Sequence, residues 1–275
     1  MIVRTAVIIL NRNLPNPTNT LCEYFLSDTK SQLDIFVVEA GSEDDKLSKY
    51  CTWHVNDPVT RVKGLRFNRG MNYALVELLK TGRFNDYDAF LFCTNDTEYT
   101  VDNAVDKFTS TLMEHPSVGV LVPCANDWGE RLLLQDLPTK YFWSAYSCSF
   151  VVTRALIERI GDFEKPDYLN FLFDGTNFRG FMSENEIVVK GYANDFATAI
   201  TANVTFIENQ SYLIEKNDLI KTEPNRENLE LYVKEGHAWL RKKYGFNSRW
   251  AMHAYSKGMY DDFFSKHSNL KKFKI

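Results

Sequence analysis

The first half of the chain alternates apolar, β-rich runs with stretches of helical periodicity, and this alternation restricts its fold more than any other feature. The apolar runs are TAVIIL, LDIFVV, DAFLFC and VGVLVP, at residues 5–10, 33–38, 88–93 and 118–123. Helical patterns lie between them, at residues 19–28, 71–82 and 101–115. Because the apolar runs are continuous, both faces of each strand should be covered. The pattern predicts an α/β domain with a mostly parallel central sheet and helices on both faces.

The second half is less regular. Residues 147–163 predict a strand that runs into a helix, and residues 197–208 predict an alternating strand. After about residue 215 the sequence becomes charged and helical in pattern. We therefore expect an α/β domain over residues 1–215 and a helical C-terminal extension over residues 216–275, packed on the same unit.

Composition excludes several classes of protein. Hydrophobic residues make up 44% of the chain and charged residues 25%, which is ordinary for a globular protein. No run approaches the roughly 20 apolar residues of a membrane span. With 32 basic and 36 acidic residues, the net charge of -4 gives no reason to expect nucleic-acid binding. The five cysteines form no CxxC pair, and the apolar N-terminal run is short for a signal peptide, so we expect a cytoplasmic protein.

Polar residues follow the first three apolar runs, where the strands should end. Residues 11–13 are Asn-Arg-Asn, residues 39–44 are Glu-Ala-Gly-Ser-Glu-Asp, and residues 94–97 are Thr-Asn-Asp-Thr. In an open parallel sheet, ligands bind at the carboxyl ends of the strands. We therefore expect a ligand site at this edge of the sheet.

Four segments resemble, in the same order, motifs of the family 2 glycosyltransferases. They are VVEAGSEDD, FNRGMNYAL, DAFLFCTNDTEY and VVTRALIERIGDF, at residues 37–45, 67–75, 88–99 and 151–163. They are similar to the family's VVDNGSTD, NRGFAAANN, LLLNNDT and IRREVFEEVGGFD stretches, and the likeness covers roughly residues 3–212. The resemblance implies the GT-A nucleotide-sugar fold and an inverting glycosyltransferase of the rhamnosyltransferase-like NNDT variant. Such an enzyme transfers a hexosyl or deoxyhexosyl group in polysaccharide biosynthesis.

The resemblance also implies a set of residues that bind the nucleotide-sugar donor: Asn11, Glu39, Gly41, Asn68, Arg69, Asn95 and Asp96. Glu39 replaces the family's Asp, and its carboxylate can accept a hydrogen bond from a nucleoside base. Residues 68–70 precede a predicted helix, whose N-terminus would be a natural anion site, so Arg69 could reach the diphosphate or the base.

Asp96 is the expected metal ligand. A departing nucleoside diphosphate needs a Lewis acid, and a hard divalent ion such as Mn²⁺ or Mg²⁺ binds one or two carboxylates together with the phosphates. Thr94 stands where the family's DxD element has its first acid, a departure shared with the NNDT variants. Glu208 lies in the neighbourhood where the family often has a His, and it is a second candidate ligand.

Inverting transfer needs a general base for the acceptor hydroxyl, and the family supplies it from a Glu-Asp pair that this chain lacks. Asp174, after the apolar run FLF, is the best match, and its apolar neighbours are expected to raise its pKa. Glu184 and Glu186 are the rival bases.

The expected acceptor is a glycan or lipid-linked oligosaccharide hydroxyl. Trp128, Trp143 and Tyr146 lie where such enzymes hold their acceptors, and aromatic rings stack on sugar faces. A peripheral membrane contact is expected from the basic residues at 241–243 and from the interleaved Lys and Phe of residues 271–275.

Two other functions fit parts of the pattern. A sugar-phosphate nucleotidyltransferase also binds a nucleotide on an open sheet, but it favours a glycine-rich loop that residues 11–13 lack. A non-catalytic nucleotide-sugar-binding protein would explain the absent Glu-Asp pair and the absent His.

Overall fold

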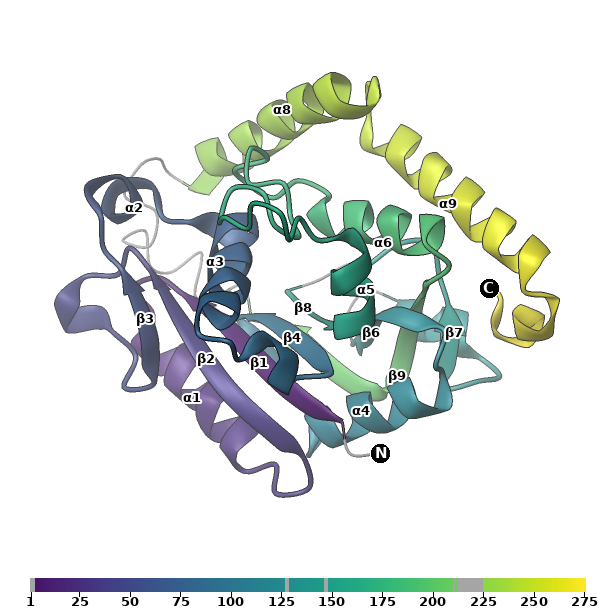
Figure 1. The fold of residues 1–275 in the computed structure, drawn as a ribbon, viewed down its shortest axis with the longest axis horizontal. Coiled ribbons are helices and arrows are strands. Elements are labelled where there is room, and N and C mark those ends of the chain that lie inside the picture. Colours follow the sequence, from purple (N-terminus) through teal and green to yellow (C-terminus); the bar gives the residue numbers. More distant parts are fainter. Residues whose placement is uncertain (1–2, 127–128, 146–147, 210, 212–224) are drawn as a thin grey trace.

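The structure is a computed structural model of residues 1–275, and it describes residues 3–126, 129–145, 148–209, 211 and 225–275. Within these residues, nine strands form one sheet in the order β3-β2-β1-β4-β8-β6-β9-β5, and β7 pairs with β9 (Figure 1). The strands are β1 (Arg4–Asn11), β2 (Gln32–Ala40), β3 (Cys51–Val55), β4 (Ala89–Thr94), β5 (Thr97–Tyr99), β6 (Val118–Ala125), β7 (Thr139–Tyr141), β8 (Ser149–Thr153) and β9 (Ala197–Glu208).

One half of the sheet is parallel, as the apolar runs predicted. Strands β3, β2, β1 and β4 all run in the same direction. Their register places Asn11 opposite Glu39 and Leu10 opposite Thr94. The polar residues that follow the first three apolar runs therefore meet at one edge of the sheet, as expected.

The other half is mixed. Strand β8 runs antiparallel to both β4 and β6, whereas β9 is parallel to β6. The reversal has a local cause: the chain enters β8 at the end of β4, where the Thr94 amide donates to the carbonyl of Cys148 at 2.8 Å. A strand that begins at this edge can only run back along its neighbour.

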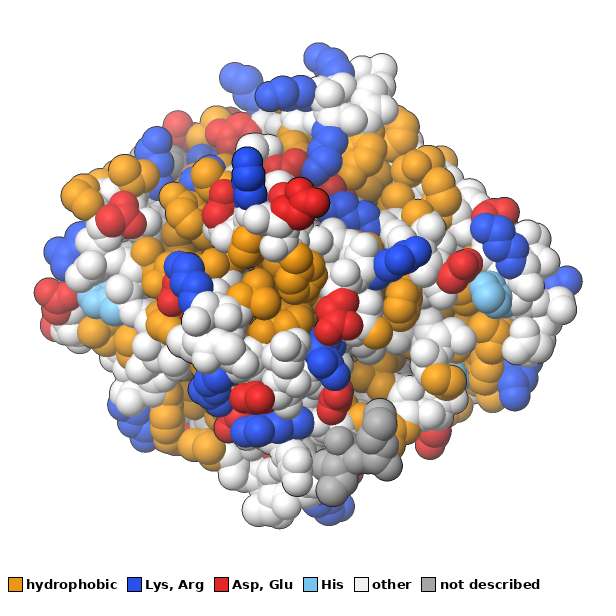
Figure 2. All heavy atoms as spheres, in the orientation of Figure 1, with side chains coloured by type: hydrophobic (Ala, Val, Ile, Leu, Met, Phe, Trp, Pro, Cys, Tyr) orange, Lys and Arg blue, Asp and Glu red, His pale blue; other side chains and the backbone are white. Residues whose placement is uncertain are grey.

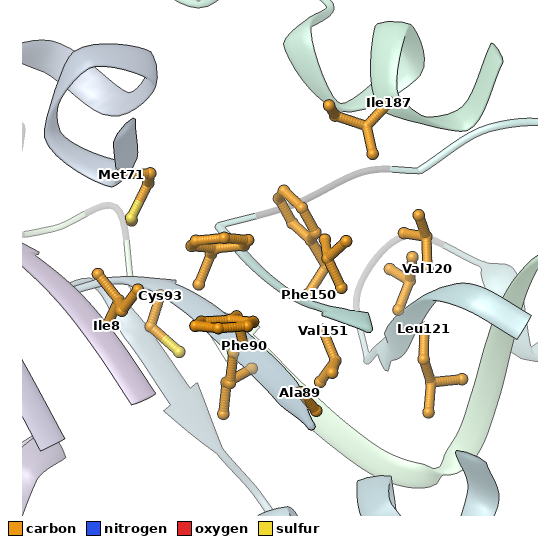
Figure 3. Close-up of a cluster of buried hydrophobic side chains, with 14 of the residues drawn as sticks. Ile8, Met71, Ala89, Phe90, Cys93, Val120, Leu121, Phe150, Val151 and Ile187 are labelled. Atoms are coloured by element: carbon orange, nitrogen blue, oxygen red, sulfur yellow. The ribbon is translucent and has the colours of Figure 1, made fainter. Parts of the chain in front are cut away.

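Helices cover both faces of the sheet (Figure 1). One face carries α1 (Pro15–Leu26) and α4 (Ala104–Glu114), and the other carries α3 (Arg66–Lys80), α5 (Arg154–Ile160) and α6 (Ser183–Ala193). Figure 3 shows Met71 of α3 and Ile187 of α6 directed toward Phe150 and Phe90 of the sheet. These side chains belong to one continuous buried core.

The helical pattern at residues 71–82 predicted α3 with one error. Gly82 has a φ of +71° just after the helix, as a C-terminal glycine should. However, α3 begins at Arg66, so residues 68–70 lie in its first turns and do not precede it. Gly70 makes the longer helix possible because a Cβ there would lie 2.3 Å from the Leu10 side chain. The short helix α2 (Pro58–Lys63) and α6 were not predicted.

Two long helices, α8 (Asn225–Tyr244) and α9 (Arg249–Lys266), follow the sheet in the sequence. Helix α9 packs against α6, and its Tyr260, Phe263 and Phe264 belong to the main core. Trp239 and Leu240 of α8 pack with Phe181 in a second apolar cluster. The expected boundary at residues 215 and 216 lies outside the described residues.

Charged side chains of both signs are interspersed over the face drawn in Figure 2. In the described part of the chain, no helix is both long enough and apolar enough to cross a bilayer.

Gly41, after β2, tests the close packing at the ligand edge. Its φ is +83°, and a Cβ would lie 2.1 Å from the backbone oxygen of Thr60. We expect Gly41→Ala to lower the free energy of unfolding by more than about 2 kcal/mol, since the backbone must move in addition to the left-handed strain. The measurement is urea denaturation.

Gly82→Ala is the matched control, because Gly82 has a similar φ of +71° and a Cβ added there would meet nothing within 4 Å. Its cost should be only about 1 kcal/mol, the left-handed penalty alone. Equal losses in the two variants would contradict the close contact with Thr60.

Candidate functional site

Two adjoining cavities open at the carboxyl ends of β1 and β4, and they share Phe67, Thr94 and Asp96. The smaller cavity, about 230 Å³, is lined also by Leu10, Asn11, Arg12, Leu14, Ala40, Gly64, Arg66 and Asn95. The larger cavity, about 440 Å³, is lined also by Cys148, Gly180, Phe181, Met182, Glu184, Asn185, Glu208, Tyr232, Arg249 and His253. The ends of β1, β4 and β9 thus meet the loop before α6 and the two C-terminal helices.

Asp96 lies at the junction of the two cavities, and its side chain is almost buried, with the residue 8% exposed. The Thr94 hydroxyl donates to Asp96 Oδ1. Burial raises the Asp96 pKa, and the hydrogen bond from Thr94 only partly opposes this effect. In the part of the chain that the structure describes, no lysine or arginine forms an ion pair with Asp96. A buried carboxylate without a cation suits a positively charged ligand.

Glu208, at the end of β9, lines the larger cavity with Asp96. The two strand ends are joined, since the Asn209 amide donates to the backbone oxygen of Asp96 at 2.8 Å. The described residues hold no cluster of three or more His, Cys, Asp or Glu that could enclose a metal ion by themselves. Two carboxylates on an open cavity fit a hard divalent ion, which takes its other ligands from phosphates and water.

A chain of side-chain hydrogen bonds connects the ends of β2, β1 and β4. Asn95 donates to Asn11 Oδ1, and Asn11 donates to Glu39 Oε2, both at 2.8 Å. Glu39 is fully buried, and it also accepts from the Ser42 hydroxyl at 2.5 Å and from the Ser48 amide at 2.7 Å. Asn11 and Asn95 line the smaller cavity, whereas Glu39 does not line it and holds Asn11 in place through a hydrogen bond. Direct contact between Glu39 and a nucleoside base stays a prediction.

Two arginines at the smaller cavity were not assigned from the sequence. Arg12 directly follows Asn11, and its Nη2 donates to the carbonyls of Arg61 and Val62 at 3.1 and 2.9 Å. Its position directly after the predicted first strand could have identified Arg12 as a candidate ligand-binding residue. Arg66 begins α3 with a φ of +58°, which no sequence pattern indicates. Gly41 does not line the cavity but packs against Thr60.

Asn68 and Arg69 of α3 hold a loop and do not line either cavity. Asn68 donates to the carbonyls of Asp174 and Asn177 at 2.9 and 3.1 Å. Arg69 Nε donates to the Gly175 carbonyl at 2.8 Å, and its guanidinium lies over the Phe178 ring. Contacts of Asn68 and Arg69 with the donor therefore stay predictions. In the structure both side chains bind the backbone of the loop before α6.

Asn72, which the sequence did not single out, holds the same loop. Its Nδ2 donates to the Phe173 carbonyl at 2.7 Å, and its Oδ1 accepts from the amides of Leu172 and Phe173. These bonds satisfy buried backbone groups that no secondary structure pairs. The spacing of Asn68 and Asn72 by four residues on one helix was the signal that could have identified them.

The expected rise in the Asp174 pKa is wrong. Burial does raise it, but hydrogen bonds from Lys243, Thr176 and Trp239 outweigh burial and hold this pKa well below its usual range. Lys243 Nζ lies 2.6 Å and Trp239 Nε1 2.9 Å from Asp174 Oδ2, while the Thr176 hydroxyl lies 2.6 Å from Oδ1. The apolar sequence neighbours of Asp174 gave no indication that Lys243 and Trp239 of α8 would hydrogen-bond to it.

Of the two rival bases, Glu184 faces the larger cavity. It lies in the first turn of α6, and burial raises its pKa to about 7. Glu186 is 2% exposed, and it accepts from Lys243 at 2.7 Å and from the Tyr244 hydroxyl at 2.8 Å. Of these two acids, Glu184 is therefore the one that lines the cavity, and its pKa is near neutrality.

Of the expected acceptor aromatics, Trp143 is described by the structure, and it lines neither cavity. Trp143 packs against α9, with its ring 5.3 Å from that of Tyr260 and the Lys257 ammonium 5.1 Å above it. Trp128 and Tyr146 lie outside the described residues. At the chain end, Phe273 packs on His115 and Tyr141, with ring centroids 4.6 and 5.3 Å apart. Phe273 therefore faces the protein and not a lipid surface.

By sequence, the chain matches no protein-family model and no curated protein. By structure, it is similar to the mannosyltransferase PcManGT from Pyrobaculum calidifontis in complex with GDP-Man and Mn²⁺. That match has a TM-score of 0.56 and 10% identity, and it covers 96% of this chain and 88% of the other. The chain has the GT-A fold. This confirms the expected fold class.

Glucosyl-3-phosphoglycerate synthase from Mycobacterium tuberculosis is a second similar GT-A structure. Its complex with Mn²⁺, UDP-glucose and phosphoglyceric acid matches with a TM-score of 0.53 and 12% identity. The match covers 90% of this chain and 81% of the other. A further complex of the same enzyme, with Mn²⁺, UDP and glucosyl-3-phosphoglycerate, gives a TM-score of 0.51 at 11% identity over the same shares.

Asp174 should contribute acid-sensitive stability to this GT-A domain. Because its folded pKa is depressed, the stability it supplies is present above the unfolded pKa of about 4 and is lost as pH falls through the folded pKa. We expect Asp174→Asn to lower the free energy of unfolding by about 1–3 kcal/mol at pH 7. The deficit should shrink steadily below about pH 4.

The measurement is chemical denaturation of both proteins across this pH range. Asp45→Asn is the control, since Asp45 is exposed on the loop after β2. A deficit that is the same at every pH would show that the carboxylate charge of Asp174 does not stabilise the fold.

Proposed function

We propose that the protein is a metal-assisted glycosyltransferase, which moves one sugar from a nucleotide-diphosphate donor to an acceptor hydroxyl. The observation that carries the proposal is the position of Asp96, a buried carboxylate without a cationic partner among the described residues, at the junction of two cavities. Such a junction suits a reaction in which a diphosphate leaves on one side and a hydroxyl attacks from the other.

The smaller cavity would hold the nucleoside diphosphate. Asn11 and Asn95 present amides there, and Arg12 and Arg66 bring positive charge. Arginine binds phosphate oxygens with well-defined geometry, and its charge complements a diphosphate. Support also comes from the similar GT-A structures described above, which contain GDP-Man or UDP-glucose with Mn²⁺.

Asp96 and Glu208 would hold the divalent metal, Mn²⁺ or Mg²⁺. When bound, such an ion neutralises charge that develops on the departing diphosphate. The remaining work falls to the chain itself. Thr94 orients the Asp96 carboxylate through its hydroxyl, and the hydrogen bond from the Asn209 amide to the Asp96 carbonyl keeps the end of β9 beside the turn that follows β4.

Glu184 would act as the general base for transfer with inversion. Its carboxylate takes the proton of the acceptor hydroxyl as the hydroxyl oxygen bonds to the anomeric carbon. The bond from that carbon to the diphosphate breaks, and the diphosphate leaves with the electron pair. A pKa of about 7 leaves much of Glu184 ionised at neutral pH while keeping it basic. Asp174 is less suited, because Lys243 and Thr176 occupy its oxygens.

A glycan or lipid-linked acceptor in the cytoplasm completes the proposal. None of the five cysteines, all of which lie among the described residues, forms a disulfide, which suits a reducing compartment. Since Phe273 packs inward, a peripheral membrane contact would rest on exposed basic side chains at Arg241, Lys242, Lys271 and Lys272.

Asp96→Asn should weaken binding of the donor nucleotide only when metal is present. We expect Mn²⁺ to tighten binding of GDP or UDP to the wild-type chain and to have an effect at least about tenfold smaller in the variant, since an amide is a poor ligand for a hard cation. Titration calorimetry with and without Mn²⁺ measures this. Asp102→Asn, which removes an exposed carboxylate outside both cavities, is the control. Unchanged Mn²⁺ dependence in Asp96→Asn would refute the metal site.

Glu184→Gln should lower kcat by about 10²–10⁴-fold while nucleotide binding survives, because it removes only proton transfer. In the wild type, kcat should fall as pH drops below about 7, where Glu184 becomes protonated, and this limb should vanish in the variant. Sugar transfer assays across pH measure both effects.

Asp174→Asn is the comparison variant and should keep most of its turnover. The opposite pattern, with Asp174→Asn inactive and Glu184→Gln active, would restore Asp174 as the base. If neither variant loses turnover, the general-base mechanism fails.

A further inference from the structure

The larger cavity contains a positively charged side chain that the proposed chemistry does not use. Arg249 is the first residue of α9, and it lines this cavity together with Glu184 and Asp96. Its guanidinium lies 4.9 Å from the Trp250 ring centroid. In the described part of the chain, no carboxylate lies within ion-pair distance of Arg249. An arginine that opens into a cavity with its donors uncommitted suits an anionic ligand.

Tyr232 and His253 line the cavity with Arg249, and Tyr232 relates Arg249 to Glu184. Tyr232 of α8 is close enough to feel both charges, since Glu184 raises and Arg249 lowers its pKa, although burial dominates the rise. His253 lies one helical turn after Arg249 and also lines the cavity. Burial and then the Arg249 charge lower the His253 pKa, so its imidazole is neutral near pH 7 and can exchange hydrogen bonds.

The donor diphosphate does not account for Arg249. Arg249 does not line the smaller cavity, which has Arg12 and Arg66 of its own. Asp96 and Glu208, which would serve the metal, line the same cavity, but the charges that act on Tyr232 are those of Glu184 and Arg249. The charge of Arg249 is therefore available to the molecule whose hydroxyl meets Glu184.

We propose that the acceptor carries an anionic group, a phosphate or a carboxylate, which Arg249 binds while the acceptor hydroxyl faces Glu184. This inference rests on the proposed function and adds the chemical class of the acceptor. Phosphate and carboxylate share the geometry that a guanidinium recognises. His253 supplies a neutral hydrogen bond beside the same anionic group. Arg249 thereby selects the acceptor and sets the position of its hydroxyl.

The test uses the full chain with Mn²⁺ and whichever of GDP and UDP binds to it. The probes are glycerol 3-phosphate, glycerate and glycerol, which share hydroxyls and differ in the anionic group, together with inorganic phosphate. Calorimetry should detect binding of at least one of the two anionic probes and of inorganic phosphate, and none of glycerol. The first two probes separate a phosphate from a carboxylate site.

Arg249→Gln should weaken binding of the anionic probe by about 10- to 100-fold, and Arg249→Lys should recover part of it, because Lys keeps the charge without the planar fork. Arg226→Gln is the matched control, since Arg226 is an exposed arginine of α8 outside both cavities. It makes the same change in net charge and should leave binding unchanged.

The inference is overturned if no anionic probe binds, if glycerol binds equally well, or if Arg249→Gln binds the anionic probe like the wild type. It is also overturned if Arg249→Gln weakens GDP or UDP and spares the anionic probe, since Arg249 would then serve the donor. Failure of the proposed function looks different: the wild type would then show no Mn²⁺-dependent binding of GDP or UDP.

Discussion

The ligand edge of this protein depends on one buried carboxylate, that of Glu39. Burying an ionised carboxylate is costly unless every oxygen is hydrogen-bonded. Here Asn11, Ser42 and Ser48 supply those bonds, and Asn11 passes the connection on to Asn95. Breaking any of these contacts would leave a buried polar group unpaired, so the ends of β1, β2 and β4 are held together. The floor of the smaller cavity is the result.

The larger cavity is built in a different way, by elements that come from far apart in the sequence. Side-chain amides of Asn68 and Asn72 bind the backbone of the loop at residues 168–181, which leads into α6. The loop in turn presents Asp174 to Lys243 of α8. Gly236 lets α8 approach this loop closely, since a Cβ there would lie 2.2 Å from the Phe181 ring. The two C-terminal helices are thereby fixed where Tyr232 and Arg249 reach the cavity.

The acidic residues of this region differ because their partners differ. Asp174 and Glu186 both form ion pairs with Lys243 of α8, and these pairs hold the loop and α6 to that helix. Asp96 and Glu184 are desolvated and form no ion pair within the described chain, and the pKa of each is raised. Buried acids that pair with a cation of the chain stabilise the fold, whereas buried acids without such an ion pair are suited to bind a cation or to transfer a proton.

Sequence alone determined the layered α/β architecture and the edge at which polar residues gather, because continuous apolar runs and helical periodicity are local properties of the chain. It therefore predicted β1, β2, β4, β6, β8 and β9, and it placed Asn11, Asn95 and Asp96 at one edge. Only the tertiary structure decided three other features. They are the antiparallel course of β8, the ion pair of Asp174 with Lys243, and the position of Arg249 on the cavity that Glu184 also lines. Each of these features depends on which distant segment supplies a hydrogen bond, a charge or a cavity lining. A local sequence pattern does not specify that distant segment. Asp174 and Glu184 are both acids in irregular sequence, and only the cation beside one and the cavity beside the other separate a structural ion pair from a candidate base.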